Sequence, residues 1–136
     1  MQSGAAAERF GVMLAAMGGP ADFVEGWAHQ LPESPVIRAV PAAEPGIVQA
    51  IDGEALGLAV VALGGGRMVE SDRVNPAVGV SDVVRLGQRV ERGQPLAMVH
   101  AARSDDADRA VAAVGAAIML GEADASTPAL ICAQVG

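Results

Sequence analysis

Residues 36–67 read VIRAVPAAEPGIVQAIDGEALGLAVVALGGGR, and this segment predicts a mixed α+β fold. Two short apolar runs at 36–40 and 46–51 are typical of strands, and the proline-flanked link between them is typical of a turn. Asp52 stands where an N-cap is expected, before a helix over about 53–63. Apolar residues surround the axis of this helix, so we expect it to be buried on most sides.

The rest of the C-terminal part continues the alternation of strands and helices. The expected elements are, in order, strands at 80–86 and 96–100, a helix at about 105–121 and a strand at 129–135. Gly93 lies in a turn-rich link between the first two strands and suits a positive φ. Ser104 is placed to cap the helix, and Gly121 to end it.

The first 34 residues have a different pattern. Apolar residues at helical spacing predict an amphipathic helix over 4–17 with Ser3 as its N-cap. Pro20 suits the first position of a second helix, about 20–30. The first helix has little before it to pack against, so we expect residues 1–34 to be a helical segment of a larger domain and 35–136 to be a separate module.

Composition excludes several classes of protein. The 136-residue chain is 51% hydrophobic but only 2% aromatic, so its core must be built from Ala, Val, Leu, Ile and Met. A net charge of −7 argues against nucleic acid or an anionic membrane as the main partner. All nine basic residues are arginine, which excludes a Schiff-base, Walker-A, biotinyl or lipoyl lysine. A single cysteine, Cys132, excludes an internal disulfide and fits a reducing compartment.

No targeting segment is recognisable. The N-terminus lacks the basic and apolar regions of a signal peptide. The longest apolar run, 56–63, is under half a membrane span. These features predict a cytoplasmic protein without a membrane partner.

The triple glycine Gly64-Gly65-Gly66, followed by Arg67, is the most distinctive local feature. It does not fit the dinucleotide-binding or P-loop patterns, because it follows a helix and no Gly-Lys-Ser/Thr comes after it. Two interpretations stay open. It is a helix C-cap with a flexible loop, or a mobile loop close to a ligand.

Other groups able to do chemistry are scattered. They are His29, His100, Cys132, the acidic cluster Asp105, Asp106 and Asp108, and the arginines Arg67, Arg73 and Arg85. No nucleophile elbow, EF-hand loop or helix-spaced histidine pair is present. The acidic cluster suits a helix N-terminus better than a cation site. We therefore predict no catalytic, cofactor-binding or metal-binding residue in this chain.

Residues 87–100 look like the hairpin of biotinyl and lipoyl carrier domains. That likeness suggests a free-standing binding or scaffold module. The carrier turn requires a modifiable lysine, however, and the chain has none.

A second resemblance covers nearly the whole chain. Segments similar to the C-terminal part of the thymidine phosphorylases, in the pyrimidine-nucleoside phosphorylase family, occur in the family's order: 3–20, 22–25, 55–67, 71–72, 78–82, 86–87 and 95–101. Each segment alone is a weak match to the family. Together, in the family's order and at close spacing, the segments make a specific match.

The resemblance implies that the chain is a piece of a longer enzyme. Family members convert a pyrimidine nucleoside and phosphate to the free base and (deoxy)ribose 1-phosphate, and they work as homodimers. Their catalytic residues lie upstream of the matched region, so none is carried over. The resemblance further implies an α/β-hammerhead core, related to the barrel-sandwich hybrid, and a cleft-facing loop at Gly64–Arg67.

Overall fold

The computed structural model describes residues 3–123, and the chain divides into two compact units between Glu33 and Ser34. The predicted strand at 129–135, with Cys132, lies outside the described residues. Among the helices of residues 3–123, none has the length and apolar character needed to cross a membrane.

The first unit is a pair of helices, α1 (Ala5–Ala16) and α2 (Phe23–Gln30). The prediction of an N-cap at Ser3 was wrong: Gly4 is the N-cap, with φ +74°, and no side chain bonds to the helix there. Pro20 does not begin the second helix, because residues 17–22 form a turn and helix α2 starts after Asp22.

Neither helix of this unit buries a side chain completely. The rings of Phe10 and Phe23 meet edge-on with centroids 6.3 Å apart. The large apolar residues left exposed are Phe10, Val12, Met13, Met17, Trp27 and Leu31. A pair of helices within a 33-residue unit, with this surface, lacks the core that an independent domain needs.

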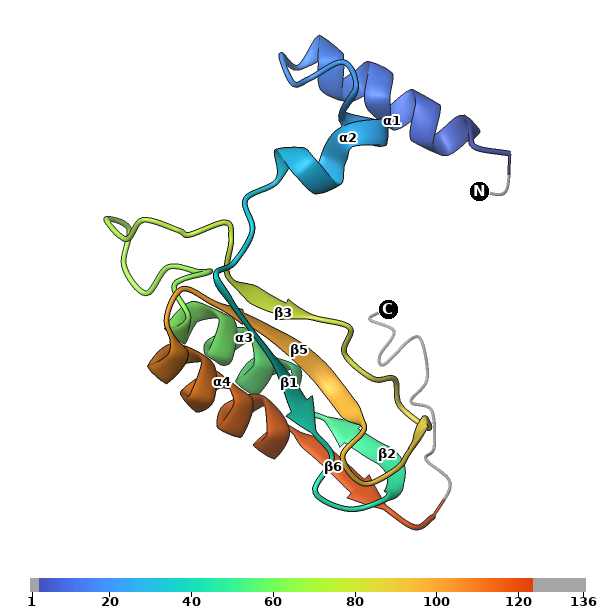
Figure 1. The fold of residues 1–136 in the computed structure, drawn as a ribbon, viewed down its shortest axis with the longest axis vertical. Helices are drawn as coiled ribbons and strands as arrows, with labels where there is room; N and C mark the ends of the chain where they lie inside the picture. Colours follow the sequence, from blue (N-terminus) through green and yellow to red (C-terminus); the bar gives the residue numbers. More distant parts are fainter. Residues whose placement is uncertain (1–2, 124–136) are drawn as a thin grey trace, which may run out of the picture. The chain divides into compact units, whose positions relative to one another are not determined.

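The second unit, as far as residue 123, contains six strands and two helices (Figure 1). In chain order they are β1 (Val36–Pro41), β2 (Gly46–Ile51), α3 (Gly53–Ala62), β3 (Gly79–Ser81), β4 (Arg89–Val90), β5 (Pro95–Ala101), α4 (Ser104–Ala116) and β6 (Ile118–Gly121). They build two antiparallel sheets, ordered β1–β5–β3 and β4–β2–β6. The predicted α+β class is confirmed.

Strand β5 is the centre of the first sheet. It pairs with β1 from Val36↔Ala101 to Val40↔Ala97, and with β3 through Val80↔Val99. Strand β3 is shorter than the predicted 80–86, because Asp82 takes a positive φ of +53° and turns the chain away.

The link from β3 to β5 joins the two sheets. It is not a tight turn: Val84 N–H donates to Leu96 O in one sheet, at 2.9 Å, and Gly87 N–H to Val48 O in the other, also at 2.9 Å. Strand β4 lies within the link and pairs with β2. Gly93 has the predicted positive φ, +81°.

Helix α4 packs against β1, β5 and α3 (Figure 1). Its buried side chains are Ala107, Ala110 and Val114.

The prediction that helix α4 runs to Gly121 was wrong, since the helix ends at Ala116 and residues 118–121 pair with β2 instead. Nor does Ser104 cap it: Arg103 is the N-cap and no side chain bonds there. Strand pairing outweighs helical spacing here because β2 has a free edge for Ile118 and Leu120.

Asp52 caps helix α3 as predicted, its Oδ1 accepting from Ala55 N–H at 3.0 Å. The expectation that this helix is buried on most sides was wrong for the described unit. Only Ala59 within the helix is buried, and Leu58 is 57% exposed. One side of α3 packs against α4, and an apolar side remains open.

The core is built from small side chains, as the composition predicts. The largest fully buried residues among those described are all valine: Val40, Val48, Val90, Val99 and Val114. No polar or charged residue of the described part is buried. Methionine does not contribute to this core, contrary to the prediction.

Deleting residues 1–33 should leave a cooperative fold, because the single core lies within residues 40–118. Residues 34–136 alone should melt in one sigmoidal transition, followed by circular dichroism. The 136-residue chain is the reference. A gradual, non-cooperative melt of the shortened chain would contradict this expectation.

Candidate functional site

The glycine loop begins as the C-cap of helix α3. Gly64 has φ +92°, its N–H donates to Val61 O, and Gly65 N–H donates to Val60 O, both at 2.9 Å. These bonds satisfy carbonyls at the helix end that would otherwise lack partners. The C-cap interpretation of the first glycine is therefore confirmed.

The other two glycines are needed for space, and neither has a positive φ. A Cβ on Gly65 would lie 2.8 Å from Val60 Cγ1 and 3.2 Å from the carbonyl oxygen of Val78. On Gly66 it would lie 2.6 Å from Val61 Cγ2. Close packing on α3, and not a need for positive φ, therefore restricts side chains at these two positions.

The loop beyond Gly66 has its own hydrogen bonds. Asp72 Oδ2 accepts from the N–H groups of Met68 and Val69, at 3.0 and 3.1 Å. Asn75 N–H donates back to Gly64 O at 2.8 Å. These bonds hold a turn whose tip exposes 77% of Met68. That 64–79 is the most mobile internal segment stays a prediction.

The three arginines that the sequence offers as groups able to do chemistry, Arg67, Arg73 and Arg85, are all exposed. Arg67 and Arg73 lie in the loop, and Arg85 lies in the link between β3 and β5. Within residues 3–123, the ion pairs involve other arginines, namely Arg38, Arg103 and Arg109.

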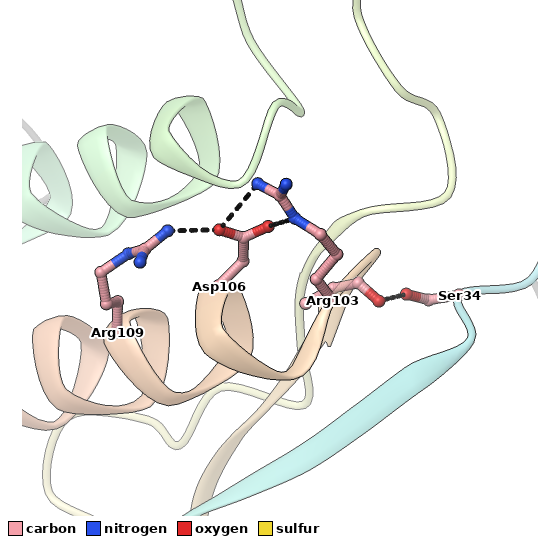
Figure 2. A network of polar contacts seen from close by, with 5 residues as sticks. Ser34, Arg103, Asp106 and Arg109 are labelled. Carbon is pink, nitrogen blue, oxygen red and sulfur yellow. Dashed lines mark hydrogen bonds and ion pairs between the residues drawn. The ribbon is translucent and has the colours of Figure 1, made fainter.

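The acidic cluster is held by arginines at the start of α4. Asp106 accepts from Arg103 Nε at 2.8 Å and pairs with Arg109 (Figure 2). Asp108 pairs with Arg38 at 3.4 Å. The hydrogen bond from Arg103 lowers the pKa of the Asp106 carboxyl below its usual range. The described residues hold no cluster of three metal-ligating groups, and this arrangement is an ion-pair network.

Figure 2 shows a second contact beside this network. Ser34 Oγ donates to the carbonyl oxygen of Ala101 at 2.6 Å. The bond ties the start of the second unit to the end of β5. It fixes backbone position and provides no reactive group.

A contact that the sequence analysis missed joins Ser81, Asp82 and His100. Ser81 Oγ donates to Asp82 Oδ2 and lies 2.9 Å from His100 Nε2. Because the single hydroxyl proton goes to Asp82, His100 Nε2 must be the donor to Ser81. A histidine that donates to the hydroxyl cannot act as its base, so Ser81 is not an activated nucleophile. Strand pairing brings these residues together, and the spacing of residues in the local sequence does not indicate the contact. His29, by contrast, is exposed on α2.

Gly64→Ala should destabilise the chain by about 1–2 kcal/mol, because a Cβ is unfavourable in the left-handed region. Gly57→Ala is the matched control: it lies within α3 with open space around its Cβ and should stabilise by about 0.5–1 kcal/mol. Urea unfolding measures both. Equal effects of the two substitutions would rule out a cap at Gly64.

Asp106→Asn should change how stability depends on pH. The carboxyl pKa is lowered by folding, so its stabilisation is present above the unfolded pKa and is lost as pH falls through the folded one. The stability difference between the native chain and Asp106→Asn should be full at neutral pH and shrink below about pH 4. Asp105→Asn controls for charge loss on the same turn. Stability differences that stay constant from neutral to acid pH would contradict the pairing.

Comparison with known proteins gives a consistent result. The family model described as the pyrimidine nucleoside phosphorylase C-terminal domain matches residues 47–121. A protein named thymidine phosphorylase from Burkholderia cenocepacia (strain HI2424) is 48% identical over 130 residues, which is 96% of this chain and 30% of the relative. One from Agrobacterium fabrum is 50% identical over 111 residues, 82% of this chain and 25% of the relative.

A further protein of that name, from Burkholderia lata, aligns with all 136 residues at 46% identity, and these cover 31% of its length. The chain thus spans about 30% of the length of the relatives it matches. The matched region contains both helices of the second unit and all its described strands except β1 and the first residue of β2. The chain belongs to the pyrimidine nucleoside phosphorylase family, and residues 47–121 of its second unit match that family's C-terminal domain.

Proposed function

We propose that this chain is the C-terminal part of a thymidine phosphorylase, a pentosyltransferase of pyrimidine nucleoside metabolism. The observation that carries the proposal is the 46–50% identity to proteins of that name along nearly the whole chain. The parent protein would exchange the base of thymidine for phosphate, giving thymine and 2-deoxy-D-ribose 1-phosphate.

The reaction makes demands that explain why the chain would act only as part of the parent. The glycosidic C–N bond breaks while a phosphate oxygen bonds to the anomeric carbon, and negative charge develops on the departing base. Stabilising that charge requires preorganised donors in a site from which water is excluded. In residues 3–123 every charged side chain is at least partly exposed, and the ionic groups that pair do so with one another. This supports a structural role and an inactive isolated chain.

The exposed apolar side chains of the first unit also support the proposal that this chain is part of a longer enzyme. The helices of this unit expose Met17 at 77% and Trp27 at 55%, and a larger domain would cover these side chains. We assign residues 1–34 to the larger α/β domain of the parent and 35–136 to the C-terminal domain. A homodimeric parent and the hammerhead topology remain expectations from the family resemblance, and a cytoplasmic location remains an expectation from the sequence.

We further propose that Gly64–Arg67 faces the substrate cleft of the parent and helps to order its closed form. The loop's compact start supports this role. Gly64 ends the helix, and Gly65 and Gly66 lie against Val60 and Val61, so the direction in which the loop leaves α3 is fixed. A loop that leaves its helix in a fixed direction is suited to close over a site.

Thymine release under saturating phosphate tests this proposal. The parent should be active, and the 136-residue chain should show neither turnover nor nucleoside affinity. Gly65→Val in the parent should lower kcat about tenfold or more while the fold survives, because a misplaced loop hinders closure.

Gly53→Val is the matched control, since its Cβ would meet nothing within 4 Å. It should leave turnover unchanged. Turnover by the 136-residue chain would overturn the accessory role. The interpretation of the chain as a free-standing module would then be an alternative again. A fully active Gly65→Val parent would overturn the role of the loop.

A further inference from the structure

The groove between α3 and α4 is apolar and open. It has a volume of about 160 Å³ and is lined by Ala59, Ala62, Leu63, Asp106, Arg109, Ala110 and Ala113. Figure 1 shows the two helices side by side. Leu58, one helical turn before Ala62 and therefore on the same face of α3, is 57% exposed.

Helix α3 has the composition of a buried helix. Between Ala55 and Ala62 every residue is Ala, Leu, Val or Gly, and the helix has no polar face for solvent. Helices that are apolar all round are covered on all sides. Helix α4 covers one side and the glycine loop packs against Val60 and Val61, but Leu58 is 57% exposed, so part of the apolar surface of α3 has no partner in the described unit.

The polar rim of the groove argues against a charged ligand. Asp106 is the only acidic lining residue, and Arg103 and Arg109 both bind its carboxylate on the side of α4 that faces α3 (Figure 2). Within the lining itself, the charges of Asp106 and Arg109 pair with each other and leave no net charge. An apolar side chain is the occupant that this lining suits.

We propose that the α3–α4 groove, with Leu58 at its edge, docks an apolar segment of the parent chain that precedes Met1. The inference rests on the proposed function, because the relatives are about three times as long and this family model is a C-terminal domain. A stable interface between separate molecules buries about 1,200–2,000 Å², far more than one groove and one leucine provide. A segment of the same chain needs less, because covalent connection supplies a high effective concentration.

Cysteine accessibility tests the docking. Leu58→Cys and Ala62→Cys are made separately in the parent and in the 136-residue chain, and N-ethylmaleimide labelling is followed by peptide mass spectrometry, which separates these sites from Cys132. Both should label at least tenfold more slowly in the parent. Ala112→Cys, an exposed position of α4 outside the groove, should label equally fast in both proteins.

Equal labelling rates for Leu58→Cys and Ala62→Cys in the two proteins would overturn the proposal, as would equal protection of Ala112→Cys. Slow labelling already in the 136-residue chain, or protection that rises with its concentration, would show a different occupant and overturn it too. Thymine release is assayed in the same preparations. An active parent with an unprotected groove refutes the docking alone, whereas an inactive parent with a protected groove refutes the thymidine phosphorylase activity alone.

Discussion

The second unit depends on strand β5 more than on any other element. It is paired along both edges, with β1 on one side and β3 on the other. Its residues Ala97, Val99 and Ala101 are completely buried. Helix α4 packs across this strand through alanine and valine. Removing a buried methyl group leaves a cavity and adding one strains close neighbours, so these small contacts fix the spacing between sheet and helix.

A core of this kind has consequences for chemistry. Every charged group of the described residues lies at or near solvent, where the Asp106 network and the Arg38–Asp108 pair are screened. Catalytic groups usually gain their strength from desolvation and from neighbours that shift their pKa values. The described unit provides rigid positions for the glycine loop and for helix α3, and these are its contribution to a larger protein.

Local patterns in the sequence predicted some elements well and others poorly. Strand β2, the Asp52 cap and the positive φ of Gly93 depend on neighbouring residues, and each was predicted. The C-terminal end of α4 was missed because residues 118–121 continue the helical spacing, while their pairing with β2 depends on residues about 70 positions earlier. The same limit hid the Ser81–His100 contact, which two paired strands create. For α3 the composition predicted burial, and the described unit buries one side only.

Hydrogen exchange of the 136-residue chain, resolved by residue, tests the central role of β5 most directly. The amides of Leu96–Ala101 that bond to β1 or β3 should exchange slowest, near the rate set by global unfolding, and those of 67–74 should exchange fastest among residues 34–123. Exchange in β5 as fast as in the loop, or a slowest-exchanging set confined to β2 and β6, would contradict the account.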